Sequence, residues 1–375
     1  MSADGPPCRE RLVRTWSRRG PLRTLLGPLA WTYRFGVASR RAAFRVGVFR
    51  RRTASVPVVS IGNLTVGGTG KTPATLWLAG RLLADGHATT IVTRGYSGRL
   101  GSRTEVVGRV GEALLDIDEI GDEAALLSAR FAGSVVSGAD RVRAVELAVE
   151  KEGAEIVVLD DGFQHWRLAR DVDIVLIDGS FGFGNGSLLP AGPLREPVRA
   201  LRRAHAIVVT KDAPSEELLA TLRRHVPETP VFSAELASAG IVDWTDGALR
   251  KRPLGELVGR RVVTVSGIAE PRSFYEALGA LEIQAVEVLE YPDHHRFTTS
   301  DWHRINQAAH RADLVVCTEK DLVKLRRFPF ARGRLVALRV DFTLPPTDEE
   351  RLYALVLERL RLSEERVNGR AGEVG

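Results

Sequence analysis

Cysteine is almost absent from this 375-residue sequence, which contains only Cys8 and Cys317. Two cysteines cannot form a disulfide framework, and no Cys-x-x-Cys spacing indicates a zinc site. A reducing compartment is therefore expected. Long apolar runs are absent as well, since none approaches the roughly 20 residues that a membrane-spanning helix requires. The N-terminal region also lacks the apolar core of a secretory signal peptide.

Lysine is missing from residues 1–55, although this segment is the most basic part of the chain. It contains 13 arginines against two acids, Asp4 and Glu10, so its net charge is +11. Because the whole chain has a net charge of +6, the other 320 residues carry −5. The basic character therefore belongs to this segment, which argues against a globally basic nucleic-acid-binding protein.

Apolar and aromatic residues alternate with the arginines of this N-terminal segment. They are Leu22, Leu25, Leu26, Leu29, Trp31, Tyr33, Phe35, Phe44, Val46, Val48 and Phe49. A basic stretch with such residues is typical of a helix that lies on an anionic membrane surface. A solvated helix packed on the protein, or a basic RNA-binding arm, would show a similar pattern.

From Val56 onward, short apolar runs alternate with helical stretches. Strands are expected at Val56–Ile61, Thr89–Thr93, Ser134–Ser137, Glu155–Leu159, Asp173–Ile177, Ala206–Thr210, Arg261–Val265, Gln284–Val288, Asp313–Cys317 and Leu335–Val340. Helices are expected at Lys71–Asp85, Asp122–Phe131, Ala139–Lys151, Ser215–Arg224, Pro271–Leu281, Ser300–His310 and Asp348–Leu362. This alternation predicts an α/β fold with a mostly parallel sheet covered by helices on both faces.

Three segments are expected along the chain. Residues 1–55 form a basic amphipathic, membrane-associated helical segment, residues 56–234 a P-loop nucleotide-binding core, and residues 235–375 a smaller C-terminal α/β domain. The turn-rich stretch Ser233–Arg260 is expected to be irregular, which places the second boundary near Ala234. The polar tail after Ser363 is expected to be frayed.

The stretch Val56–Pro73 places a Val-rich strand, a glycine-rich loop and a helix start in the order of a phosphate-binding P-loop. The glycines let backbone N–H groups turn toward phosphate oxygens, and the helix N-terminus adds a positive dipole. Lys71 is expected to reach the β- and γ-phosphates of ATP, and the Thr72 hydroxyl to bind Mg²⁺. The strict motif has glycine at the position of Thr65, so Gly67–Gly68 are expected to supply the turn. The predicted nucleotide-binding residues are Thr65, Val66, Gly67, Gly68, Thr69, Gly70, Lys71 and Thr72.

Carboxylates stand at two further places where an element begins or ends. Asp160 and Asp161 follow an apolar strand, where acidic residues typically hold Mg²⁺ or its waters in P-loop proteins, although a capping role in a turn is the alternative. Asp122 precedes an apolar helical run. It is either the N-cap of that helix or a base that accepts a proton from an attacking hydroxyl.

Two polar blocks complete the candidate site. Arg195 and Glu196 lie between two prolines that restrict the backbone, which suits an arginine fixed near phosphates and equally a surface ion pair. The block Asp293-His294-His295 has no neighbouring cysteine or third histidine, so zinc is disfavoured. A His–Asp partnership in proton transfer is the better interpretation.

Two blocks that follow apolar strands resemble the guanine-reading motif of GTPases. They are Thr210-Lys211-Asp212 and Thr318-Glu319-Lys320-Asp321. In both, aspartate directly follows lysine, so the spacer residue of that motif is missing. This argues against GTP as the nucleotide.

Together these motifs resemble the tetraacyldisaccharide 4′-kinase family of Gram-negative bacteria. They run in family order across about residues 22–326 and comprise Gly62–Leu64, Gly67–Pro73, Thr93–Tyr96, Gly121–Glu123, Asp160–His165, Pro193–Pro197, Pro292–His295 and Thr318–Asp321. The blocks Gly67–Pro73 and Asp160–His165 are the most specific. Ala124 departs from the family pattern, which has proline there, and the last 40 or so residues match no part of it.

The resemblance implies transfer of the ATP γ-phosphate to the 4′-hydroxyl of a tetraacylated glucosamine disaccharide 1-phosphate, forming lipid IVA in lipid A biosynthesis. It implies ATP and Mg²⁺ as cofactors, a lipid substrate, and a monotopic enzyme on the cytoplasmic face of the bacterial inner membrane. It implies no nucleic acid and names no protein partner.

The resemblance also assigns roles to ambiguous residues. Asp122 looks like the catalytic base, assisted by His294 or His295, and Lys71 acts in catalysis on the phosphates. The residues that look like the nucleotide and Mg²⁺ side of the family's site are Thr72, Glu123, Asp160, Asp161, Gln164, Arg195 and Glu196.

Two other functions share some of these features. A membrane-bound P-loop ATPase that uses hydrolysis as a localisation switch predicts ATP hydrolysis without an acceptor, stimulated by bilayers or a protein partner. A nucleic-acid-binding ATPase that uses the arginine-rich segment predicts a steeply salt-dependent affinity for RNA.

Overall fold

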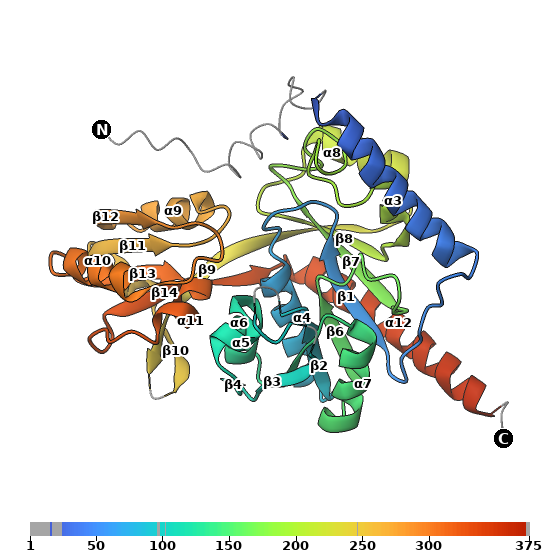
Figure 1. The fold of residues 1–375 in the computed structure, drawn as a ribbon, viewed down its shortest axis with the longest axis horizontal. Coiled ribbons are helices and arrows are strands. Elements are labelled where there is room, and N and C mark those ends of the chain that lie inside the picture. The colour runs from blue at the N-terminus through green and yellow to red at the C-terminus, as the bar shows by residue number, and fades with distance from the viewer. Residues whose placement is uncertain (1–15, 17–24, 96–97, 102, 246, 373–375) are drawn as a thin grey trace. The chain divides into compact units, whose positions relative to one another are not determined.

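The computed structural model describes residues 16, 25–95, 98–101, 103–245 and 247–372 (Figure 1). Its elements are α3 (Gly27–Arg45), β1 (Val58–Asn63), α4 (Lys71–Ala84), β2 (Thr89–Thr93), β3 (Glu105–Arg109), β4 (Glu112–Ala113), α5 (Ile117–Ile120), α6 (Asp122–Arg130), β5 (Ser134–Ser137), α7 (Arg141–Glu152), β6 (Ile156–Asp160), β7 (Val172–Asp178), η1 (Val198–Arg203), β8 (Ala206–Thr210), α8 (Glu216–His225), β9 (Val231–Thr245), β10 (Ala248–Arg252), η2 (Leu254–Leu257), β11 (Arg261–Ser266), α9 (Arg272–Gly279), β12 (Gln284–Glu290), α10 (Thr299–Ala309), β13 (Leu314–Thr318), α11 (Glu319–Leu325), β14 (Leu335–Thr343) and α12 (Pro346–Gly372).

The chain divides into two compact units. The first comprises Met1–Lys71, Ile156–Glu235 and Thr343–Gly375, and the second comprises Thr72–Glu155 and Leu236–Phe342. These units differ from the three segments expected from the sequence, whose bounds stay a prediction.

The first unit is built on a parallel sheet in which β1 lies between β6 and β7. β8 pairs with β7, and the beginning of β9 pairs with β8. Every residue of β1, β6, β7 and β8 is buried, as expected for parallel strands rich in valine and isoleucine. Leu64 and Phe163 pack with Val175, Leu201 and Leu222 in one core cluster, so the loops after β1 and β6 are fixed to the interior.

The second unit contains β2 and β5 as a parallel pair, with β3 antiparallel to β5 and β4 antiparallel to β3. Helix α7 packs on β2 and β5, and α6 packs on β3. Helix α6 is short and apolar, and only Glu123 and Arg130 of its nine residues are not buried. Its position is therefore set by contacts on all sides.

The second unit also holds a parallel sheet with β11 between β12 and β13, and with β14 beyond β13. Because the chain continues from β11 to a strand on one side and then to a strand on the other, the strand order reverses at β11. Ligands of open α/β sheets bind at the carboxyl ends of strands near such a reversal. The segment Pro292–His295 follows β12, and Thr318–Asp321 begins at the last residue of β13, so both motifs lie at this edge.

The predicted mostly parallel α/β architecture with helices on both faces is confirmed. The prediction of an irregular Ser233–Arg260 is wrong, because β9 and β10 form an antiparallel hairpin that pairs Ile241–Thr245 with Ala248–Arg252. The alanine, serine and glycine of this stretch have low strand propensity, which cross-strand pairing overrides. The tail after Ser363 was also predicted wrongly, since α12 continues to Gly372.

Helix α3 belongs to the first unit and begins the continuously described part of the N-terminal segment (Figure 1). It carries no acid in its first turn and ends on Arg45. Phe44 is buried on the ring of Trp166, with centroids 6.1 Å apart, while Trp31 and Phe35 are 70% and 75% exposed. Among the described residues, no helix is long and apolar enough to cross a membrane.

Candidate active site

The glycine-rich loop joins the end of β1 at Asn63 to the start of α4 at Lys71. The backbone N–H of Val66 donates to the Pro193 carbonyl at 2.9 Å, and the Arg195 N–H donates to the Leu64 carbonyl at 2.8 Å. Inside the loop, the Asn63 side-chain amide donates to the Thr69 hydroxyl at 3.1 Å. The loop is therefore held in shape by the segment that carries Arg195.

Glycine is required in this region for two different reasons. Gly67 and Gly70 have φ angles of 128° and 81°, which a residue with a Cβ rarely adopts. At Gly67 a Cβ would meet no atom within 4 Å, so the requirement there is conformational. Gly62 is different, because a Cβ on it would lie 2.6 Å from the Cβ of Phe163. The end of β1 thus touches the turn after β6.

Lys71, Asp161 and Arg195 converge beside this loop. The Asp161 carboxylate accepts two hydrogen bonds from Nη1 of Arg195, at 2.8 and 3.0 Å, and Nζ of Lys71 lies 3.9 Å from it. Asp161 adopts a φ of +55°, an unfavourable angle for a residue with a side chain. Two cations and one carboxylate leave a positive charge here, which suits a phosphate group.

The donors near the end of β6 fit a magnesium ion. Asp160 is 3% exposed and Asp161 follows it, so two carboxylates stand at the carboxyl end of a parallel strand. Thr72, whose hydroxyl was also expected to bind Mg²⁺, is the second residue of α4 and belongs to the second unit. The described residues contain no group of three His, Cys, Asp or Glu side chains that could hold a metal. This oxygen-only, incomplete set suits Mg²⁺, which keeps several waters and takes phosphate oxygens as ligands.

Gln164 and Glu196 lie in the same unit but differ in their partners. Gln164 donates to the Asn63 carbonyl at 2.8 Å and accepts from Arg195 at 3.4 Å, so it belongs to the loop. Glu196 is 4% exposed and accepts two hydrogen bonds from Arg203. Arg203 lies over the rings of Phe163 and Trp166. Glu196 therefore acts through Arg203 on the segment after β6, which contains Phe163 and Trp166.

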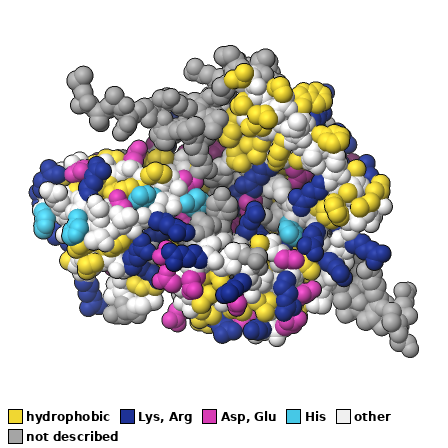
Figure 2. Space-filling model, in the orientation of Figure 1, with side chains coloured by type: hydrophobic (Ala, Val, Ile, Leu, Met, Phe, Trp, Pro, Cys, Tyr) yellow, Lys and Arg dark blue, Asp and Glu magenta, His cyan; other side chains and the backbone are white. Residues whose placement is uncertain are grey.

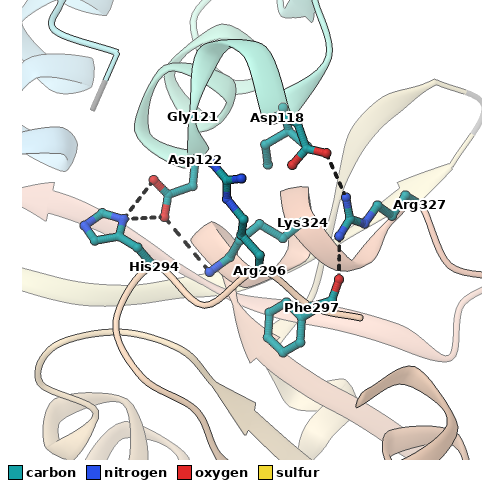
Figure 3. Close-up of a pocket in the computed structure, with 9 residues that line it drawn as sticks. Asp118, Gly121, Asp122, His294, Arg296, Phe297, Lys324 and Arg327 are labelled. Carbon is teal, nitrogen blue, oxygen red and sulfur yellow. Dashed lines mark hydrogen bonds and ion pairs between the residues drawn. The ribbon is translucent and has the colours of Figure 1, made fainter. Parts of the chain in front are cut away.

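Asp122 and His294 meet in the second unit. Nδ1 of His294 lies 2.9 Å from Oδ2 and 3.1 Å from Oδ1 of Asp122 (Figure 3). Asp122 is the first residue of α6, and the N-cap is Gly121. The interpretation of Asp122 as the N-cap is therefore wrong, although its Oδ1 accepts from the Glu123 N–H at 3.0 Å. The carboxylate is 5% exposed and faces the imidazole.

His294 reaches this carboxylate from a tight turn. The His295 N–H donates to the Pro292 carbonyl at 3.1 Å, which closes the turn, and His294 has a φ of +58°. That conformation costs free energy in a residue with a side chain, and such residues cluster at functional sites. Nε2 of His294 faces Asp293 at 3.8 Å, so the ring lies between two carboxylates.

The charges around Asp122 keep it ionised. Burial alone would raise its pKa, but the hydrogen bond from His294 and the charges of Lys320 and Lys324 outweigh burial and lower the pKa below its ordinary value. The hydrogen bond to Asp122 raises the pKa of His294 above its ordinary value, against the effect of burial. Both shifts favour the ionised forms, a carboxylate paired with an imidazolium.

The neighbouring histidine has other contacts. Nε2 of His295 lies 3.0 Å from Oδ2 of Asp301, and its ring stacks on Tyr291 with centroids 4.7 Å apart. Asp301 also forms a capping box with Thr298 at the start of α10. Of the two histidines left open by the sequence, the structure brings His294 to Asp122 and places His295 against α10.

Sequence reasoning missed three residues near Asp122. Lys324, Asp118 and Arg327 line a cavity of about 30 Å³ together with Ile117, Gly121, Asp122, His294, Arg296 and Phe297 (Figure 3). Nζ of Lys324 lies 4.0 Å from Oδ2 of Asp122, and Arg327 pairs with Asp118 at 3.4 Å. No motif marked these residues, because an isolated charged residue on a short helix or in a turn has no sequence signature.

Comparisons with known proteins agree in one assignment. Residues 22–361 match the model of the family described as tetraacyldisaccharide-1-P 4′-kinase. The match extends into the last 40 or so residues, so the expectation that these match no part of the family is wrong. A protein of Syntrophobacter fumaroxidans named tetraacyldisaccharide 4′-kinase is 44% identical over 331 residues, covering 87% of this chain and 85% of its own length. One of the same name from Anaeromyxobacter dehalogenans strain 2CP-1 is 44% identical over 345 residues, covering 88% and 90%.

A solved structure gives the same result for the fold. The chain is similar to LpxK from Aquifex aeolicus in complex with ATP, with a TM-score of 0.73 and 31% identity. The match covers 90% of this chain and 99% of that one.

Proposed function

Because the chain belongs to the tetraacyldisaccharide-1-P 4′-kinase family, we propose that it transfers the γ-phosphate of ATP to the 4′-hydroxyl of a tetraacylated glucosamine disaccharide 1-phosphate, forming lipid IVA in lipid A biosynthesis. The observation that carries the proposal is the contact between the buried carboxylate of Asp122 and the partly exposed imidazole of His294. A P-loop alone serves hydrolysis equally well, whereas a carboxylate held by an imidazole is suited to activating a hydroxyl.

The first unit supplies the nucleotide side of the reaction. The backbone of Thr65–Gly70 surrounds the phosphates, and Lys71 and Arg195 neutralise their charge. Asp160 and Asp161 would hold Mg²⁺, which neutralises charge on the phosphate oxygens when bound, while the other two predicted ligands, Thr72 and Glu123, belong to the second unit. Support for ATP comes from the similar LpxK chain, whose structure contains it.

The second unit supplies the base. The proton of the attacking hydroxyl passes to a carboxylate oxygen of Asp122 as the new oxygen–phosphorus bond forms, and the bond to the β-phosphate oxygen breaks to release ADP. His294 holds the carboxylate in place through Nδ1. A positioned base contributes about 10²–10⁴-fold to such a step. His295 bonds to Asp301 and has no part in this transfer.

Transfer of labelled γ-phosphate tests the proposal. Purified full-length protein with Mg-ATP is incubated with the lipid disaccharide 1-phosphate, and labelled lipid and free phosphate are both quantified. Labelled lipid is expected from the wild type and not from Lys71→Ala. Free phosphate without labelled lipid, stimulated by bilayers alone, would instead establish a localisation ATPase.

We also propose that the enzyme lies on the cytoplasmic face of the inner membrane through α3 and the residues after it. Figure 2 shows hydrophobic side chains gathered over this helix, interspersed with basic ones. The exposed apolar side chains are Leu25, Leu29, Trp31, Phe35, Val46, Val48 and Phe49. Exposed arginines among them, including Arg34, Arg40 and Arg45, suit anionic headgroups.

A further inference from the structure

The motif Thr318–Asp321 and the helix that it begins have no role in the function proposed so far. Helix α11 has seven residues, and six of them are buried. It packs against α6, the helix that begins with Asp122 (Figure 1). The side chain of each charged residue of α11 contacts a residue of another segment.

Glu319 contacts the C-terminal end of α6. Its Oε2 accepts from Nη1 of Arg130, the last residue of α6, at 3.0 Å, and from the Val340 N–H at 3.2 Å. The side chains of Glu319 and Arg130 are each 8% exposed. Arg130 also donates to the Val340 carbonyl and to Asp341. The C-terminal end of α6 is therefore fixed to α11 and to β14.

Lys320 and Lys324 contact the N-terminal end of α6. Nζ of Lys320 donates to Oε1 of Glu123 at 2.9 Å, and Nζ of Lys324 lies 4.0 Å from Oδ2 of Asp122. Lys324 also pairs with Asp321 at 2.7 Å, and Asp321 accepts from the Gly267 N–H at 2.8 Å. The first two residues of α6 thus face two lysines, and one of these, Lys324, is anchored through Asp321 to the loop after β11.

These contacts fix α6 at both ends, which matters for geometry more than for stability. The attraction within a buried ion pair is about equal to the free-energy cost of removing its charges from water. Apolar residues of similar size would therefore stabilise the unit equally well. Apolar packing restrains a helix along its axis less specifically than hydrogen-bonded pairs at both ends do, because those pairs are directional. A shift of α6 along that axis would separate Asp122 from His294, which lies on a different segment.

We propose that Glu319 and Lys320 are positioning residues that hold α6 in the register at which Asp122 meets His294. The proposal rests on the function proposed above for that pair. Neither residue touches the reacting atoms. Each acts through a partner on α6, and loss of either contact lets the carboxylate move relative to the imidazole.

The test measures kinetics and the Asp122–His294 contact separately in the full-length protein. The variants are Glu319→Ala, the nearly isosteric Glu319→Gln, Lys320→Met and Lys320→Arg. Asp243→Asn is the matched control, since Asp243 is also 8% exposed and pairs with an arginine, Arg252, within the same unit. The contact is followed by the ¹⁵N signals of labelled histidine, with His294→Gln identifying the resonance of His294.

Glu319→Ala and Lys320→Met are expected to lower kcat about ten- to a hundred-fold, the size of effect that a misplacement of about 1 Å produces, with the KM for ATP little changed. The Nδ1 signal of His294 should move toward that of a histidine without a carboxylate partner. Lys320→Arg and Glu319→Gln should recover most of kcat, because they retain a donor and an acceptor. Asp243→Asn should change neither kcat nor the signal.

Two outcomes would overturn the proposal. One is wild-type kcat in folded Glu319→Ala and Lys320→Met. The other is a reduced kcat with an unchanged His294 signal, which would show that these residues act without moving the pair. If the wild type transfers no phosphate to the lipid while the signal still moves in the variants, the proposed function fails and the positioning role stands.

Discussion

Nδ1 of His294 lies 2.9 Å from Oδ2 of Asp122, although 172 residues separate them in the chain. Asp122 is the first residue of α6, and His294 lies in the turn after β12. Neither location predicts the other. The contact makes a buried carboxylate available as a proton acceptor without leaving its charge unpaired, which would be costly.

Replacing Asp122 tests its role as the base. Asp122→Asn keeps the size of the side chain and its ability to bond to His294, but the amide cannot accept the hydroxyl proton. We expect kcat to fall about 10²–10⁴-fold with little change in ATP affinity. Turnover and equilibrium ATP binding measured on the same sample separate the two effects. An unchanged turnover would leave Asp122 as a structural residue only.

The pair also makes stability depend on pH in a defined direction. The lowered pKa of Asp122 means that its contribution is present above its unfolded pKa, near 4, and is lost as pH falls through the folded value. The raised pKa of His294 means that its contribution is present below its unfolded pKa, near 6.5, and is lost as pH rises through the folded value.

His294→Gln should therefore destabilise the protein most between about pH 4 and 6.5, and progressively less above the folded pKa of His294. Thermal unfolding of both proteins across pH 4–9 measures the difference. His310→Gln, which removes a histidine at the end of α10, serves as the control. A destabilisation by His294→Gln that does not vary with pH would contradict the ion pair.

The part of the candidate site that lies in one continuous stretch of sequence, the P-loop, was predictable. The P-loop is one continuous stretch, so strand, glycine loop and lysine are read directly, and β1 and α4 lie within two residues of their predicted bounds. The choice between His294 and His295 was not predictable, because adjacent residues share the same motif. Only the turn at Pro292, with its positive φ at His294, directs one ring to Asp122.

The fold was predictable where strands are rich in valine and isoleucine and fully buried. Strands β2, β5 and β8 have the predicted bounds, and all their residues except Ser134 are buried around a core of valine and isoleucine. Strand β9 was missed because its burial is uneven and its residues favour no element. Helix α11 was missed because a seven-residue helix is too short to show a periodic pattern.

Replacing Gly62 with alanine tests the close contact between the end of β1 and the turn after β6. A Cβ at this position would lie 2.6 Å from Cβ of Phe163, so Gly62→Ala must displace the buried Phe163 turn. We expect a loss of about 1–3 kcal/mol and a lower melting temperature. Gly80→Ala is the matched control, because a Cβ there meets no atom within 4 Å in the middle of α4. It should raise stability slightly. A wild-type melting temperature in Gly62→Ala would refute the contact.

The exposed aromatic residues of α3 test the membrane proposal. Trp31→Glu and Phe35→Glu each remove a side chain whose burial in the bilayer would contribute about 1.5–3 kcal/mol. Each should weaken binding to vesicles containing anionic lipid by roughly ten-fold or more. Ser39→Glu adds the same charge to the same exposed helix without removing an aromatic ring and should have a smaller effect. Equal effects in a flotation assay would mean that charge alone governs binding.

Lys71 tests the phosphate site itself. Its Nζ lies 3.9 Å from Asp161, whose carboxylate is held by Arg195, so Lys71→Ala leaves that carboxylate facing the phosphates with one cation fewer. We expect transfer to fall by at least about 10²-fold, because the lost charge acts on the phosphoryl group in the transition state.

Lys151→Ala, which removes an exposed lysine from the end of α7, is the control and should retain wild-type transfer. Titration of ATP in the presence of Mg²⁺, followed in both variants, distinguishes lost binding from lost catalysis. Removal of Mg²⁺ with a chelator should abolish transfer in the wild type and in the control. Transfer that persists in Lys71→Ala at the wild-type rate would show that the P-loop lysine has no part in the reaction.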